Sequence, residues 1–307
     1  MDDELAARLR EHPDFPGDFK VAGREKGENN FNFVVKGREE KYVVRVPRGG
    51  GENRLKSEAR MLEFLEQQGI ENVPTRILYL EDYPALVESF AGGMELESEN
   101  LTGARLENLA SLLARIHSIP VDRYNEFFDS DRPRKTTLEK VYREDFEKWS
   151  RKRLEEYLEL AENPDERLEE YSERQRELFE SADLDIEVPH AVTHGDLSHN
   201  IRGSGDRVYI IDWELGRVGY PVHDLLYFLH WQELEAWQEE KLISAYREHR
   251  DLPGYEKTKD IYPKFLSYND TIWAANRMVK AEGDEKERFR QMFQERMERL
   301  ENMYREV

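Results

Sequence analysis

Two acidic motifs lie close together in the second half of the sequence. The first, HGDLSHN, spans residues 194–200, and the second, VYIIDWE, spans residues 208–214. Phosphoryl transfer needs one carboxylate that orients the attacking hydroxyl, and an amide oxygen and a second carboxylate that hold magnesium on the phosphates. Asp196, Asn200 and Asp212 supply these three groups, so their types and spacing indicate phosphoryl-transfer chemistry.

A hairpin between the motifs would bring the two aspartates together. Residues 203–206, Gly-Ser-Gly-Asp, have the composition of a tight turn. The apolar run at 208–211 is typical of a buried strand. Asp196 and Asp212 are therefore expected to be neighbours in space, although they are sixteen positions apart.

The composition of the 307-residue chain limits the possible partners. Its net charge of −20 argues against nucleic acid and favours solubility, a saline cytoplasm or a cationic substrate. The absence of cysteine excludes disulfides and thiolate chemistry. No apolar run approaches the length of a membrane span and the N-terminus is charged, so we expect a cytoplasmic protein without a membrane partner. The 34 aromatic residues provide material for a folded core.

The first ninety residues predict strands and two helices. The expected strands are residues 31–35, 42–47, 76–80 and 85–90, and the expected helices are residues 3–11 and 55–68. The polar turn before Phe31 contains Gly27, and a glycine-containing hairpin can offer backbone N–H groups to phosphates. Most such hairpins only turn the chain, so this signal is weak by itself.

Arg45 and Glu58 each allow two interpretations. Arg45 lies in a strand among valines, where it could face solvent or could be a cation held beneath bound phosphates. Glu58, on the following helix, could pair with Arg45, or it could be a solvated first-turn residue stabilised by the helix dipole.

The remainder of the sequence is mostly helical, and we place a domain boundary at Ala91-Gly92-Gly93. The expected domains are residues 1–91 and 92–307. Helices are predicted at residues 106–117, 239–249, 261–281 and 284–305, with a helix beginning at 223 and a loop at 216–221. The charged block at about 134–180 reads as a helix pair with one apolar stripe, which could line a substrate pocket or cover the domain.

In motif order, residues 20–230 resemble the aminoglycoside phosphotransferase and choline kinase superfamily, whose fold is related to that of protein kinases. The resemblance rests on the turn at 27–31, the strand at 42–47, Glu58, the segment 86–88, the helix end at 114–117, and the two acidic motifs followed by Asp224. It implies an α+β, protein-kinase-like fold of two lobes. The smaller N-terminal lobe would have an antiparallel sheet with one helix and bind the nucleotide, and the larger lobe would be mostly helical.

The resemblance also implies roles for individual residues. Asp196 would accept or orient the proton of the substrate hydroxyl, Asn200 and Asp212 would bind Mg²⁺, and Asp224 would brace the catalytic loop. The cofactors would be ATP, or GTP, and Mg²⁺. The residues implied in nucleotide binding are Gly27, Asn30 and Phe31 in the turn, Arg45 at the phosphates with Glu58 holding it, and the backbone from Glu88 to Phe90 at the adenine.

Two features depart from the family pattern. The phosphate cation is Arg45 where several relatives have lysine; arginine also binds phosphates and stays charged. Asn200 is four residues after Asp196, whereas five is usual in the family. Either the loop takes a tighter path that keeps Asn200 on the metal, or the metal site is weakened, since a shift of roughly 1 Å can cost about 10²-fold in rate.

We therefore expect an ATP- and Mg²⁺-dependent phosphotransferase that acts on a hydroxyl of a small molecule, an amino alcohol or an aminosugar. Carboxylates and aromatic faces recognise such cations, and the candidates are Glu214, Tyr268, Asp270 and Trp273. The last three could equally belong to an ordinary helix with Trp273 in the core. The main alternative is a catalytically impaired, kinase-like nucleotide-binding protein. A protein kinase is disfavoured because no long activation segment follows Asp212. The sequence does not indicate an oligomeric state.

Overall fold

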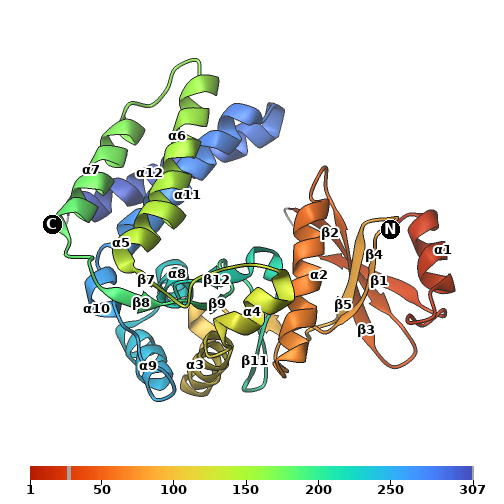
Figure 1. Ribbon diagram of the computed structural model, residues 1–307. Helices are drawn as coiled ribbons and strands as arrows, with labels where there is room; N and C mark the ends of the chain where they lie inside the picture. Colours follow the sequence, from red (N-terminus) through yellow and green to blue (C-terminus); the bar gives the residue numbers. More distant parts are fainter. Residues whose placement is uncertain (26–28, 306–307) are drawn as a thin grey trace. The chain divides into compact units, whose positions relative to one another are not determined.

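The computed structural model describes residues 1–25 and 29–305, and at residues 25, 145 and 146 it describes the backbone alone. The chain forms two compact units (Figure 1). Unit 1 consists of Met1–Arg132, Ala191–Val218 and Gln232–Asp251, and unit 2 consists of Pro133–His190, Gly219–Trp231 and Leu252–Val307. The domain boundary expected at residues 91–93 stays a prediction.

Unit 1 contains a five-stranded antiparallel sheet with the strand order β1-β2-β3-β5-β4. Its strands are β1 (Lys20–Glu25), β2 (Asn30–Lys36), β3 (Lys41–Pro47), β4 (Arg76–Leu80) and β5 (Ala85–Ser89). Helix α1 (Asp3–Glu11), capped by the Asp2 side chain, packs Leu5 and Leu9 into one hydrophobic cluster with Val44 and Val87 of the sheet. Helix α2 (Glu52–Gln67) contacts β3, β4 and β5.

The register of β3 and β5 places two charged side chains on the same face of the sheet. Val44 lies opposite Val87, whereas Arg45 lies opposite Leu86 and Val43 opposite Glu88. Because successive side chains of a strand point to opposite faces, Arg45 and Glu88 share the face that does not carry Val44. Arg45 is only 4% exposed, so it does not face solvent.

Unit 1 also contains the two acidic motifs and a set of further elements. These elements are β6 (Met94–Glu95), the 3₁₀ helix Ser98–Asn100, α3 (Gly103–His117), α4 (Val121–Phe128), β9 (Ala191–Thr193), β10 (Ile201–Ser204), β11 (Arg207–Ile210), the 3₁₀ helix Trp213–Leu215, β12 (Arg217–Gly219) and α9 (Ala236–Arg247). The hairpin predicted between the motifs is present as β10 and β11. The loop predicted at 216–221 is partly wrong, because β12 pairs there with β9, a long-range contact that local composition does not reveal.

One backbone crossing in unit 1 requires glycine. Gly93 has φ +116°, and a Cβ there would lie 2.2 Å from the carbonyl oxygen of Gly203 in β10. A Cβ on Gly203 would in turn lie 2.5 Å from Leu96 Cδ2. Two backbones therefore pass in direct contact where the chain leaves β5.

Unit 2 is mainly helical. It comprises β7 (Lys135–Thr137), α5 (Leu138–Val141), a π-helix (Tyr142–Glu147), α6 (Lys148–Leu160), α7 (Arg167–Ser181), β8 (Glu187–Pro189), α8 (Val222–Gln232), α10 (Tyr255–Thr258), α11 (Tyr262–Lys280) and α12 (Gly283–Arg305). The helix pair predicted at 134–180 is present as α6 and α7, and its apolar stripe packs with α11 and α12 in one core through Leu154, Leu168, Ile272 and Phe293. The strand β7 was not predicted; it pairs with β8, about fifty residues later in the chain.

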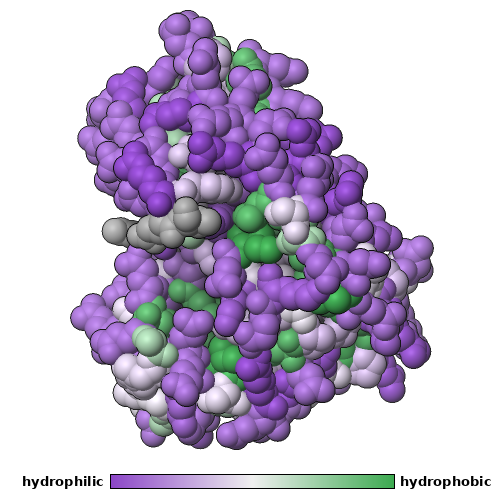
Figure 2. Space-filling model, turned by 90° about the vertical axis from the view of Figure 1, so that its left-hand side faces the viewer, coloured by the Kyte–Doolittle hydropathy of each residue, from purple (hydrophilic) through white to green (hydrophobic). Residues whose placement is uncertain are grey.

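The predicted α+β organisation, a small antiparallel sheet followed by a larger helical part, is confirmed. The face of the molecule in Figure 2 is mostly hydrophilic, with smaller hydrophobic patches. Large hydrophobic side chains exposed among the described residues are Val21, Met94, Trp149, Leu160, Leu215 and Trp237. None of the helices between residues 1 and 305 has the length and hydrophobicity that a membrane span requires.

His230 should make the stability of the fold sensitive to acid. The side chain is buried on α8, with Nε2 3.2 Å from Ser267 Oγ, and Arg299 donates to its carbonyl oxygen. Burial, and then the charge of Arg299, lower the pKa of His230 to about 3, against about 6.5 in an unfolded chain. Between these values only the unfolded state binds the proton, so the free energy of unfolding should fall by about 1.4 kcal/mol per pH unit as the pH drops.

Denaturant titrations between pH 7 and pH 4 check this expectation. His230→Gln should have a shallower loss of stability with acid than the wild type, and His249→Gln, at an exposed histidine of unit 1, should behave like the wild type. Equal slopes for His230→Gln and the wild type would contradict it.

Candidate active site

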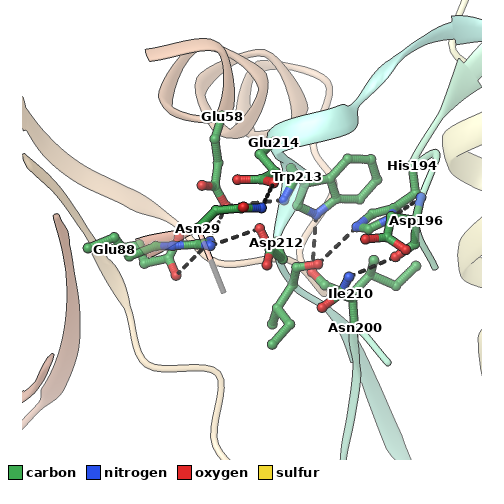
Figure 3. Close-up of polar contacts among 12 residues, drawn as sticks. Asn29, Glu58, Glu88, His194, Asp196, Asn200, Ile210, Asp212, Trp213 and Glu214 are labelled. Carbon is green, nitrogen blue, oxygen red and sulfur yellow. Dashed lines mark hydrogen bonds and ion pairs between the residues drawn. The ribbon is translucent and has the colours of Figure 1, made fainter. Parts of the chain in front are cut away.

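A buried cation, Arg45, lies among three carboxylates. Figure 3 labels the three residues that carry them, Glu58, Glu88 and Asp212. Nη1 of Arg45 forms an ion pair with Glu58 of α2 and lies 4.0 Å from Oε1 of Glu88, and Nη2 lies 2.8 Å from Oδ1 of Asp212. The pairing expected between Arg45 and Glu58 is therefore present. The contacts to Glu58, Glu88 and Asp212 together join α2, β5 and the segment after β11 around one guanidinium.

The three carboxylates keep Arg45 charged. Burial alone would lower the pKa of Arg45, but Glu58, Asp212 and Glu88 outweigh it and raise that pKa above its ordinary value. Burial also raises the pKa of Glu58 well above its ordinary range, against the opposing effect of Arg45. The cluster thus offers a permanent positive charge inside a surplus of acidic groups.

Glu58 also positions the residue that follows Asp212. Its Oε1 accepts the backbone N–H of Trp213 at 3.1 Å, and the buried indole of Trp213 donates to the carbonyl of Ile210 at 3.1 Å. Asp212 itself has φ 63° and ψ 64°, a left-handed conformation that Asp and Asn adopt more readily than most residues. The Asp212 carboxylate, 33% exposed, is held by Arg45, and the backbone after it is held by the bond from Trp213 N–H to Glu58.

The ring of His194 and the residue Asn200 connect the two acidic motifs (Figure 3). Nε2 of His194 lies 2.9 Å from the carbonyl of Ile211, and Nδ1 accepts the N–H of Asp196 at 3.2 Å. A carbonyl only accepts, so these partners are satisfied when Nε2 carries the proton. Asn200 donates from its side-chain Nδ2 to the carbonyl of Asp196 at 2.7 Å, and its backbone carbonyl accepts from Ile211 N–H at 2.9 Å. The backbone of Asp196 is thereby tied to the residue before Asp212.

The shortened loop between Asp196 and Asn200 closes as a tight turn. Asn200 N–H donates to the carbonyl of Leu197 at 3.2 Å, which directs the Asn200 side chain back toward Asp196. Gly195 starts this path with φ +86°, and a Cβ there would lie 2.9 Å from the carbonyl oxygen of Leu215. The loop is therefore a tight turn; whether it keeps Asn200 on the metal or leaves the metal site weakened, the two alternatives drawn from the sequence, stays a prediction.

The donor set fits a hard cation such as Mg²⁺. The amide nitrogen of Asn200 is used by Asp196, so its Oδ1 is the atom suited to a cation, and Asp212 has Oδ2 in addition to the oxygen that faces Arg45. The described part of the chain contains no group of three or more His, Cys, Asp or Glu side chains suited to a metal. Mg²⁺ is commonly held by one or two carboxylates together with substrate phosphates, which matches a site that a nucleotide would complete.

The residues predicted for nucleotide binding have different surroundings. Gly27 lies outside the described residues. Asn30 is buried, and with its amide oxygen toward Arg45 Nη2 that contact is 3.2 Å. The guanidinium groups of Arg24 and Arg48 lie over the ring of Phe31, 4.7 and 4.5 Å from its centroid. The ammonium group of Lys41 lies 5.3 Å from the centroid of the Phe90 ring, and the backbone N–H of Phe90 donates to the carbonyl of Lys41.

The contact of the Glu88 side chain with Arg45 was missed, and so was the bridging role of His194. The strand predicted at 85–90 contained Glu88, but its alignment with the strand of Arg45 depends on a register between distant segments. A signal for His194 existed, because the residue follows an apolar strand and directly precedes Gly195-Asp196.

The residues predicted to bind substrate have partners within the protein. Glu214, in unit 1, accepts from Asn29 Nδ2 at 2.8 Å and lies 3.7 Å from Arg54 Nη1; burial, and then the neighbouring Asp212, raise the pKa of Glu214. The other three lie on α11 in unit 2. The buried Tyr268 donates to the carbonyl of Leu168, Asp270 pairs with Arg296, and Trp273 packs against Phe289. Their contact with a substrate stays a prediction.

Removing the polar atoms of His194 should impair activity as well as stability. His194→Phe keeps a ring but leaves Asp196 N–H and Ile211 C=O without their partner, so we expect a loss of about 2–4 kcal/mol in the free energy of unfolding. Because the position of Asp196 depends on this ring, turnover should fall roughly 10²-fold. His117→Phe is a matched control, since His117 is equally buried in unit 1 and bonded to Tyr246. It should lose stability without that loss of turnover; equal losses of turnover would contradict a specific role for His194.

Comparisons with known proteins match this chain to a phosphotransferase family and to solved structures of small-molecule kinases. The sequence model of a phosphotransferase enzyme family, APH, matches residues 20–261. A comparison with proteins of curated function finds no match. Among solved structures, a choline/ethanolamine kinase family protein from Mesorhizobium loti has 19% identity and a TM-score of 0.67, over 98% of this chain and 94% of the other. APH(2")-IIa in a ternary complex with streptomycin and ATP has 19% identity and a TM-score of 0.65, over 98% and 96%. The choline kinase LicA from Streptococcus pneumoniae has 18% identity and a TM-score of 0.61, over 93% of each chain. These likenesses show a fold shared with aminoglycoside phosphotransferases and choline kinases.

Proposed function

Because the chain belongs to the phosphotransferase enzyme family, we propose that it transfers the terminal phosphoryl group of ATP, or GTP, to a hydroxyl of a small amino alcohol or aminosugar. The observation that carries this proposal is that hydrogen bonds and an ion pair in unit 1 connect a cation, a candidate metal ligand and a candidate base. The cation Arg45 contacts the carboxylate of Asp212, and the backbone around Asp212 is bonded through His194 and Asn200 to Asp196. A cytoplasmic location, where ATP and magnesium are available, is part of the proposal.

Asp196 acts as the base in this proposal. The oxygen of the substrate hydroxyl forms a bond to the γ-phosphorus while the bond from that phosphorus to the bridging oxygen of the nucleotide breaks. The hydroxyl proton passes to the Asp196 carboxylate, or is oriented by it. Such a base contributes roughly 10²–10⁴-fold to the rate.

Arg45, Asn200 and Asp212 stabilise the negative charge of the phosphate oxygens in this proposal. Arg45 faces the phosphates, and Glu58 keeps its guanidinium in place through the ion pair. Asn200 and Asp212 would hold Mg²⁺, and the bound ion would supply positive charge at the phosphate oxygens. Since the transition state carries its charge on those oxygens, placement and positive charge supply most of the catalysis.

A panel of acceptors tests the proposal. Choline, ethanolamine, aminosugars, neutral sugars and nucleosides are incubated with ATP and Mg²⁺, and phosphorylated product is measured together with ADP. Transfer to an amine-bearing alcohol, absent without Mg²⁺, is the expected result. Mg²⁺-dependent nucleotide binding without transfer to any acceptor would instead favour the catalytically impaired binding protein. No nucleotide binding with or without Mg²⁺ would refute both.

A further inference from the structure

Glu88 is the third carboxylate around a single buried cation, and resting on the function proposed above we propose that it makes binding of the nucleotide's phosphate chain depend on a divalent cation. Arg45, Glu58 and Glu88 are each at most 5% exposed, and Asp212 completes the cluster. When ionised, the four side chains carry one positive charge and three negative charges. A free polyphosphate meets this surplus of negative charge, whereas a metal-bound one brings the compensating charge with it.

The register of the sheet sets the position of Glu88. Val43 lies opposite Glu88 and Arg45 lies opposite Leu86, so Glu88 and Arg45 project from neighbouring strands on the same face. The carboxylate of Glu88 lies 4.0 Å from Arg45 Nη1, while Glu58 is bonded to that nitrogen directly. Glu88 therefore acts on the guanidinium through its charge, and Glu58 holds the guanidinium in place.

Burial strengthens the electrostatic effect of the Glu88 carboxylate on Arg45. Salt largely screens exposed charges that lie more than about 10 Å apart, but it screens buried pairs much less. An interaction between charges about 4 Å apart also strengthens as the effective dielectric constant falls. The cluster also contains a donor without a partner: the buried Nε–H of Arg45 has no acceptor among residues 1–25 and 29–305. Buried donors are nearly always satisfied, so an unsatisfied N–H on the central cation points to an anionic ligand, such as a phosphate, as its partner.

The test compares nucleotide affinity with and without metal. Dissociation constants for ATP and for inorganic tripolyphosphate are measured by calorimetry in excess Mg²⁺ and in EDTA, for the wild type and for Glu88→Gln. The wild type should bind the metal complex more tightly than the free anion. Glu88→Gln should reduce this ratio about tenfold, mainly by tightening binding of the free anion, and the change should be the same for both ligands.

Two further variants separate the charge from the shape of the side chain. Glu88→Asp restores the charge and should return the ratio toward the wild-type value, which a merely structural role would not do. Glu81→Gln removes an exposed carboxylate that pairs with Lys56 and lies in the turn between β4 and β5. This control variant should leave the ratio unchanged. Circular dichroism and thermal unfolding establish that each variant is folded.

The outcomes distinguish this inference from the proposed function. An unchanged ratio in folded Glu88→Gln, or a change seen with ATP and not with tripolyphosphate, would overturn the role of Glu88 while leaving a nucleotide-binding protein. Failure of the wild type to bind either ligand under both conditions would overturn the proposed function itself, and the inference with it.

Discussion

Asp212→Asn should lower phosphoryl transfer by roughly 10³-fold and weaken the affinity for Mg²⁺-nucleotide. Asparagine retains an oxygen for Arg45 and tolerates the left-handed backbone at this position, so the substitution removes mainly the charge that would hold the metal. Asp212→Ala should be at least as damaging, because it also loses the contact to Arg45 and places alanine in a conformation that costs about 1–2 kcal/mol.

Steady-state transfer assays over a range of Mg²⁺ concentrations, with nucleotide binding measured in parallel, check this result. Asp206→Asn is the matched control, because Asp206 is an exposed residue in the turn of the hairpin that leads to Asp212. It should behave like the wild type. Near-wild-type turnover of Asp212→Asn at saturating Mg²⁺ would remove Asp212 from the metal site.

Asp196→Asn should reduce turnover by about 10²–10⁴-fold and leave the affinity for Mg²⁺-nucleotide almost unchanged. The backbone N–H and carbonyl of Asp196 are held by His194 and Asn200, and these bonds do not involve the carboxylate. The loop should therefore keep its conformation when the side chain becomes neutral. The contrast with Asp212→Asn is the informative result, since one variant loses a base and the other loses a metal ligand.

Single-turnover measurements with saturating nucleotide separate the chemical step from binding. Turnover of Asp196→Asn within a few-fold of the wild type would exclude Asp196 as the base. Loss of nucleotide affinity equal to that of Asp212→Asn would show that Asp196 acts through the metal site instead.

The parts of the molecule that the sequence predicted are those determined by local chemistry. The hairpin between the acidic motifs follows from turn composition and an apolar strand, and the helix that carries Glu58 follows from its period. The ion pair of Glu58 with Arg45 could be anticipated because their segments are neighbours in the chain and carry opposite charges.

The parts that were missed depend on pairings between distant segments. Glu88 reaches Arg45 only through the register of β5 against β3, and a shift by one residue would have turned its side chain to the opposite face. The short strands β7 and β12 have no periodic pattern of their own and exist through their partners β8 and β9. The identity of the acceptor has no local signature, because it depends on the shape of a whole pocket.

The contact between Gly93 and Gly203 has a consequence for directed evolution of the acceptor range. Any side chain at Gly93 would enter the backbone of the hairpin that leads to Asp212, and any side chain at Gly203 would displace Leu96. Libraries that randomise either position would consist mostly of clones that fail before selectivity could be scored. Libraries aimed at the acceptor range should therefore leave Gly93 and Gly203 unchanged.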